Sequence, residues 1–62
     1  MRFRVDWFSV SRRLAQSPHL RLAVGSYRGR PALVTRDGFP LALSPKAALG
    51  VIADRSSLPL AA

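Results

Sequence analysis

Two glycine-containing turns divide the middle of this 62-residue chain into three short apolar segments. Arg28-Gly29 separates the segment 19–27 from the segment 31–36, and Asp37-Gly38 separates the second segment from 39–44. Asp-Gly between apolar runs favours a two-residue β-hairpin, and the loop length fixes which residues face each other. The sequence therefore predicts a three-strand antiparallel meander with two tight turns.

With two-residue loops, Tyr27 pairs with Arg30 and Arg36 pairs with Phe39, and this register sorts the meander onto two faces. The first face carries Arg21, Ala23, Tyr27, Arg30, Ala32, Val34, Arg36, Phe39, Leu41 and Leu43. The second face carries Leu20, Leu22, Val24, Leu33, Thr35, Pro40 and Ala42. The second face is apolar or small except for Thr35, so we expect the helices to cover it and to leave the arginine-rich face open. Arg21 and Arg36 are predicted to oppose each other there, which is unfavourable unless an anion lies between them.

Patterns on either side of the meander predict one more strand and two helices. Apolar and polar residues alternate from Met1 to Trp7, as in a half-buried strand. Ser9 or Ser11 is predicted to cap a short helix ending near Gln16, and Ser44-Pro45 is predicted to begin a helix that runs to about Asp54. We expect an α+β fold of order βαβββα, a small four-strand, mostly antiparallel sheet with two short helices packed on one face. Residues 1–55 are predicted to form a single domain, with residues 56–62 as a frayed C-terminal tail.

The composition narrows the class of function. Ten Lys and Arg against three Asp and Glu give a net charge of +7, which attracts anionic partners. Nine of the ten cations are arginine, and codon bias in a GC-rich genome would produce the same excess, so both explanations stay open. The chain has no cysteine, which excludes disulfides and favours a cytoplasmic location. No apolar run approaches the roughly 18 residues of a membrane-spanning helix.

The chain carries little that could catalyse a reaction. His19 is the only imidazole, and no carboxylate lies near it in the sequence to orient it as a general base. The three aspartates are dispersed, and the turn accounts for Asp37. We therefore predict a protein that is not an enzyme and that has no cofactor and no metal site.

The arginine-rich face predicts a binding module for a polyanionic partner, either nucleic acid or a nucleoprotein. Guanidinium groups pair with phosphates, and exposed aromatic rings stack on bases. The predicted binding residues are Arg2, Arg4, Arg21, Tyr27, Arg30, Arg36 and Phe39.

Three other interpretations stay open. The same residue types are enriched at protein interfaces, so a small inhibitor or adaptor of the kind that phages and mobile elements encode could dock on an acidic protein surface. Alternatively, Tyr27 and Phe39 only seal a small core while the arginines stay solvated. Pro40 marks the segment 39–44 as an edge strand, through which a homodimer could form.

The segment from Gly29 to Pro45, GRPALVTRDGFPLALSP, resembles the hairpin of the Phd/YefM-type antitoxins. In that family a TR-x-G-x-P-[VL]-A run crosses between two strands and leads into a helix. The resemblance implies a dimeric DNA-binding autoregulator with a toxin as partner. The family has a helix before this hairpin, whereas this chain has Pro18, Gly25 and a strand-like run there.

Overall fold

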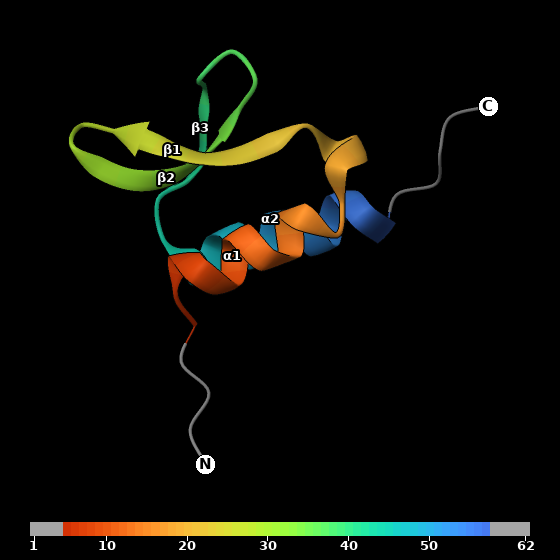
Figure 1. The fold of residues 1–62 in the computed structure, drawn as a ribbon. Coiled ribbons are helices and arrows are strands. Elements are labelled where there is room, and N and C mark those ends of the chain that lie inside the picture. Colours follow the sequence, from red (N-terminus) through yellow and green to blue (C-terminus); the bar gives the residue numbers. More distant parts are fainter. Residues whose placement is uncertain (1–4, 58–62) are drawn as a thin grey trace.

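The computed structural model describes residues 5–57 of the chain. Its elements are α1 (Trp7–Ala15), the short 3₁₀ helix η1 (Pro18–Leu20), β1 (Leu22–Tyr27), β2 (Arg30–Thr35), β3 (Pro40–Ala42) and α2 (Pro45–Ser57). The strands form an antiparallel sheet of order β1-β2-β3, and α1 and α2 lie side by side against one of its faces (Figure 1). The α+β class and the meander are confirmed, but the predicted fourth strand is not present in residues 5–57.

The N-terminal segment that was predicted as a strand ends in a helix instead. Trp7 is the first residue of α1, while residues 1–4 lie outside the described range. The carboxylate of Asp6 accepts hydrogen bonds from the Ser9 N–H at 2.9 Å and the Ser9 hydroxyl at 3.0 Å, so the cap is Asp6 rather than Ser9 or Ser11. This carboxylate satisfies a first-turn N–H that has no partner within the helix. Trp7, Val10 and Leu14 then recur at helical spacing on the side that packs against the core.

The β1–β2 hairpin forms with the predicted register. Arg28 and Gly29 have φ angles of 52° and 77°, and a two-residue turn with two positive φ angles is the type I′ turn that matches the twist of the strands. Tyr27 pairs with Arg30, and the pairing continues without a shift to the pair of Leu22 with Thr35. The first of the two predicted turns is confirmed.

The second turn is longer than predicted. The Thr35 N–H donates to the Phe39 carbonyl at 3.0 Å, and the Gly38 N–H donates to the Thr35 carbonyl at 2.9 Å, which leaves a three-residue loop from Arg36 to Gly38. Gly38 is the only one of these three with a positive φ, 86°. A two-residue type I′ turn would force Asp37 into the left-handed region as well, whereas the longer loop places only glycine there. The Thr35 hydroxyl oxygen also accepts the Phe39 N–H at 3.1 Å.

A β-bulge next to this loop restores the register that the extra loop residue displaces. Val34 pairs with Pro40, but Leu33 pairs with Ala42, so Leu41 is an extra residue on β3. The pair of Leu33 with Ala42 is the one expected from the two-residue loop. The bulge changes the orientation of Leu41, which packs against the core rather than lying on the open face as predicted.

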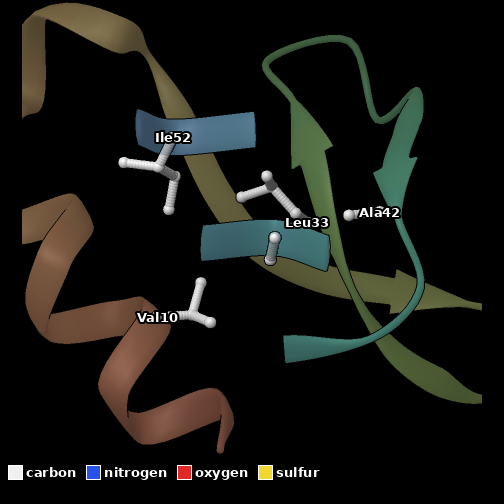
Figure 2. Packing of buried hydrophobic residues seen from close by; sticks show 5 residues of the cluster. Val10, Leu33, Ala42 and Ile52 are labelled. Carbon is white, nitrogen blue, oxygen red and sulfur yellow. The ribbon is translucent and has the colours of Figure 1, made fainter. Parts of the chain in front are cut away.

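The core lies between the helix pair and the sheet. Its buried residues come from α1, β2, β3 and α2, and they are Val10, Leu33, Ala42, Ala48 and Ile52 (Figure 2). The Ser44 hydroxyl accepts the Ala47 N–H at 3.2 Å, so the predicted cap of α2 is confirmed. The helix continues through Ser57, beyond its predicted end near Asp54.

Candidate anion-binding surface

The sheet face that points away from the helices is apolar in its middle. Ala32 and Val34 alternate with the core residue Leu33, so they lie on this open face. Both are nonetheless buried, with 0% and 8% of their surface exposed. Val34 lies over Gly25, because a Cβ atom at Gly25 would come within 2.8 Å of Val34 Cγ2. The exposed polar groups are therefore concentrated at the ends of the open face.

The end of the β1–β2 hairpin combines an aromatic ring with two arginines. The guanidinium carbon of Arg28 lies 5.3 Å from the centre of the half-buried Tyr27 ring, within cation–π range. A depression of about 290 Å³ beside them is lined by Tyr27, Arg28, Arg30, Pro31 and Leu43, and we refer to it as the tyrosine pocket. Leu43 is 64% exposed and gives the pocket an apolar wall. The pocket can accept a flat or apolar group next to an anion.

Arg21 and Arg36 lie at the opposite end of the β1–β2 ladder. The last pair there is Leu22 with Thr35; Arg21 directly precedes Leu22, and Arg36 directly follows Thr35. Arg21 is not part of a strand: it ends η1 in the left-handed conformation, with φ 56° and ψ 42°, and its N–H donates to the Pro18 carbonyl at 3.2 Å. Arg36 belongs to the three-residue loop. The predicted cross-strand pair of Arg21 with Arg36 is therefore wrong. The six residues of β1 run from Leu22 at this end to Tyr27 at the tyrosine pocket, and five steps at the usual rise per residue span about 17 Å.

Phe39 does not share the open face with these arginines. The longer loop pairs it with Thr35, and cross-strand neighbours lie on the same face of a sheet. Thr35 lies two residues after Leu33 in β2, so its side chain is on the same face as that of Leu33, which points toward the helices. Phe39 is therefore at the helix side of the sheet, where it is 65% exposed. Its predicted place on the open face is wrong, and the single extra loop residue is the reason.

The predicted binding residues thus fall into separate groups. Tyr27 and Arg30 meet at the tyrosine pocket, Arg21 and Arg36 are at the other end of the sheet, and Arg2 and Arg4 lie outside the described residues. The prediction omitted Arg28, although its place in the turn directly after Tyr27 was a usable signal. It also omitted Leu43 as a site residue, although the predicted register placed Leu43 on the same face.

A further basic group lies between the two helices. An open groove of about 280 Å³ is lined by Ser9, Arg12 and Arg13 of α1, by its C-cap residue Gln16 and by Leu49 of α2. Ser9 is three and four positions before Arg12 and Arg13, and the C-cap residue Gln16 is four and three positions after them, so the four residues gather on one side of the helix. The two arginines are in the last turn of α1, where positive charge also stabilises the helix end.

Other types of site are not found in the described part of the chain. Residues 5–57 contain no group of three or more His, Cys, Asp or Glu that could hold a metal ion. His19 is exposed in η1. Among the helices formed by these residues, none has the length and apolar character needed to cross a bilayer.

Comparisons of the chain with models of known protein families, with curated proteins and with solved structures found no match. The segment 29–45 that resembles the Phd/YefM-type hairpin does form two strands leading into a helix. It is preceded by η1 and β1, not by the helix that this family has there.

Proposed function

We propose that this protein is a non-enzymatic module that binds a polyanion, with single-stranded nucleic acid as the partner that best fits the tyrosine pocket. The observation that carries the proposal is the geometry of this pocket. An aromatic ring and two guanidinium groups at the tip of the β1–β2 hairpin line it together with the exposed Leu43, which follows β3. The other arginines act as additional phosphate contacts.

The chemistry of the pocket favours an unpaired base over a duplex. A base can stack on the ring of Tyr27 or on the guanidinium plane of Arg28, and either arrangement needs a base that is free of its own neighbours. Base stacking on an aromatic side chain contributes about 1–3 kcal/mol and tolerates any sequence. Arg28 and Arg30 are exposed and can pair with the adjacent phosphates. We therefore expect binding with weak sequence preference.

Arg21 and Arg36 extend the contact along the sheet. The two ends of the β1–β2 ladder are about 17 Å apart, so one single-stranded oligonucleotide can reach both groups of arginines. The centre of the open face is apolar, with Ala32 and Val34 buried, so it presents no charge that would repel a nucleic-acid strand crossing it. A strand on this path would neutralise charge at both ends.

The first experiment is a titration of a fluorescently labelled, mixed-sequence DNA oligonucleotide, followed by anisotropy at several salt concentrations. With about four phosphate contacts, the slope of log K against log salt should be about −3 for a single strand. No binding at low salt, or binding that salt does not change, would contradict the proposal.

A pair of matched double variants separates the pocket from net charge. Arg28→Gln with Arg30→Gln removes two charges from the tyrosine pocket, whereas Lys46→Gln with Arg55→Gln removes two exposed charges from α2. We expect the first variant to bind at least tenfold more weakly and the second to bind almost as well as the parent. Equal losses would mean that only net charge matters. Tyr27→Leu should weaken binding without changing the salt slope, because it removes stacking and no charge.

An acidic protein surface is the second candidate partner. Leu43, 64% exposed in the pocket that Arg28 and Arg30 also line, favours it because arginine is enriched at protein interfaces and a partner can bury the exposed apolar side chain beside it. A pull-down from nuclease-treated lysate distinguishes the two partners. Retention of one protein by the parent, together with no affinity for oligonucleotides, would favour the protein partner.

A further inference from the structure

The two edges of the sheet are protected to very different degrees. The β3 edge is three residues long, begins with Pro40 and carries the bulge at Leu41, and each of these features hinders the addition of another strand. The β1 edge, Leu22–Tyr27, is six residues long and pairs with β2 along its whole length without a shift. It has no proline and no charged residue. One edge is blocked, and the other is open.

The type I′ turn determines which backbone groups of β1 are free. The closing pair of such a hairpin, here Tyr27 with Arg30, is hydrogen-bonded. By alternation, Gly25 and Ala23 also bond to β2. The N–H and C=O groups of Leu22, Val24 and Ser26 therefore point away from β2, toward the open edge.

The helix below this edge presents an uncharged side to solvent as well. One side of α1 packs into the core through Val10, and another lines the groove beside α2. The positions left over are Phe8, Ser11 and Ala15, which are spaced by three and four residues and are all exposed. Phe8 is 69% exposed, the highest value among the large apolar residues described.

This uncharged side of α1 lies on the same side of the molecule as the open edge. The two helices pack against each other, and of the three strands α1 packs mainly against β1, whereas α2 packs against β2 and β3. The side of α1 turned away from α2 is therefore beneath the free edge of β1, and Figure 1 shows α1 and β1 at the same side of the two layers. The two features form one continuous surface, which we call the β1 side.

We infer that the β1 side is the interface of a symmetric dimer in which β1 pairs antiparallel with β1 of a second copy. The chain carries a net charge of +7, which opposes contact between two copies, so an interface is favoured where the contacting segments carry no charge. Leu22–Tyr27 and the exposed Phe8, Ser11 and Ala15 carry none, and Arg21 and Arg28 flank β1 at its two ends. A two-fold axis at Val24 places Leu22 of one copy opposite Ser26 of the other, and the free N–H and C=O groups of both strands then bond to each other. The result is a six-strand sheet with four helices on one face.

The dimer also changes the proposed binding surface, and this second consequence rests on the proposed function. Antiparallel pairing brings Arg21 of one copy to the hairpin end of the other, next to Tyr27 and Arg28. The two groups of arginines that lie apart within one copy then form a combined site across the interface. An oligonucleotide should therefore bind the dimer more tightly than a dimer-deficient variant.

The first test is the oligomeric state of the protein alone, measured by sedimentation equilibrium over a range of concentrations. We expect a reversible dimer that strengthens as salt increases, because salt screens the repulsion between two copies of charge +7. Salt is expected to strengthen the dimer and to weaken the binding of nucleic acid. The dimer and the proposed function can therefore fail separately. A monomer at every concentration and salt would overturn the inference.

Matched variants test the interface itself. Ser26→Pro removes an outward N–H without touching the hydrogen bonds to β2, and Ser26→Thr is its control. By symmetry the proline removes two hydrogen bonds from the dimer, each worth roughly fivefold in affinity, so the dissociation constant should rise roughly 25-fold. Phe8→Lys should also weaken the dimer, whereas Phe39→Lys, which places the same charge at a similarly exposed aromatic position next to the β2–β3 loop, should not.

Hydrogen exchange of the parent protein provides a test that needs no variant. The amides of Leu22, Val24 and Ser26 should become protected as the protein concentration rises, while that of Phe8, whose place is in the first turn of α1, should not. Protection that does not depend on concentration would contradict the inference. A dimer that survives both Ser26→Pro and Phe8→Lys with the fold intact would also contradict it. The same holds for a protein that is monomeric but captures an unrelated extended peptide on β1.

Discussion

Replacing Gly25 with alanine should destabilise this protein, although a glycine in a strand is ordinarily a weak point. Gly25 has no positive φ angle, so alanine fits its backbone. A Cβ atom at this position would lie 2.8 Å from Cγ2, 3.5 Å from Cγ1 and 3.7 Å from Cβ of Val34. Val34 is only 8% exposed and β-branched, so its side chain cannot turn away freely. The added methyl group must displace either this side chain or a strand.

Two opposing terms set the size of the effect. Overpacking a filled site costs about 1–3 kcal/mol, whereas replacing glycine with alanine reduces the entropy of the unfolded chain and stabilises by about 0.4–1 kcal/mol. The net result is a loss of about 1–2 kcal/mol. For a domain of this size that loss lowers the melting temperature by roughly 5–15 °C.

The assay is urea unfolding followed by the fluorescence of Trp7, the one tryptophan in the chain, with circular dichroism as a second probe. Gly50→Ala is the matched control. Gly50 lies inside α2, and nothing is within 4 Å of the position its Cβ would take, so the same substitution should stabilise by about 0.5–1 kcal/mol. The two glycine-to-alanine changes should therefore have opposite signs.

A double-mutant cycle identifies the cause. In a Val34→Ala background the close contact disappears, and Gly25→Ala should then be neutral or stabilising. If Gly25→Ala stabilises the parent protein, or if its cost is unchanged without the Val34 side chain, then Val34 does not lie over Gly25. The register of β1 with β2 would then have to be revised.

Three further predictions concern single positions, each measured by urea unfolding. Asp6→Ala should lower the free energy of unfolding by about 1 kcal/mol because it removes the carboxylate that accepts the Ser9 N–H. An unchanged urea midpoint would mean that α1 does not begin at this cap. Leu33→Ala should cost about 2–5 kcal/mol, since Leu33 is fully buried, whereas Leu43→Ala should change stability by less than about 0.5 kcal/mol; similar losses would place the core elsewhere. Gly38→Ala should cost about 1 kcal/mol through its φ of 86° alone, because no atom lies within 4 Å of the new Cβ, and a neutral result would contradict the three-residue loop.

The elements that the sequence predicted well are those specified by their own residues. The type I′ turn at Arg28-Gly29 needs no distant contact, and it alone fixes the pairing of β1 with β2. Ser44-Pro45 likewise specifies the start of α2 through a cap within three residues. The same local turn joins Tyr27 and Arg30, so this part of the candidate site was also predicted from the sequence.

The predictions that failed are those in which two local patterns compete. Residues Met1 to Trp7 alternate as in a strand, but Asp6 can cap a helix, and the helix buries Trp7 and Val10 against the rest of the core. Asp37-Gly38 suits both a two-residue and a three-residue loop. The difference of one residue moved Phe39 to the other face and turned Leu41 into the core.

The sequence by itself determined the composition of this protein's surface and the order of most of its elements, because charge, turn residues and helix caps act over a few neighbouring positions. Only the tertiary structure decided where the arginines lie relative to one another. A loop or a bulge that adds one residue reverses the face of every side chain until the next shift, and the choice between such alternatives depends also on which one packs Leu41 and Ala42 of β3 against the core.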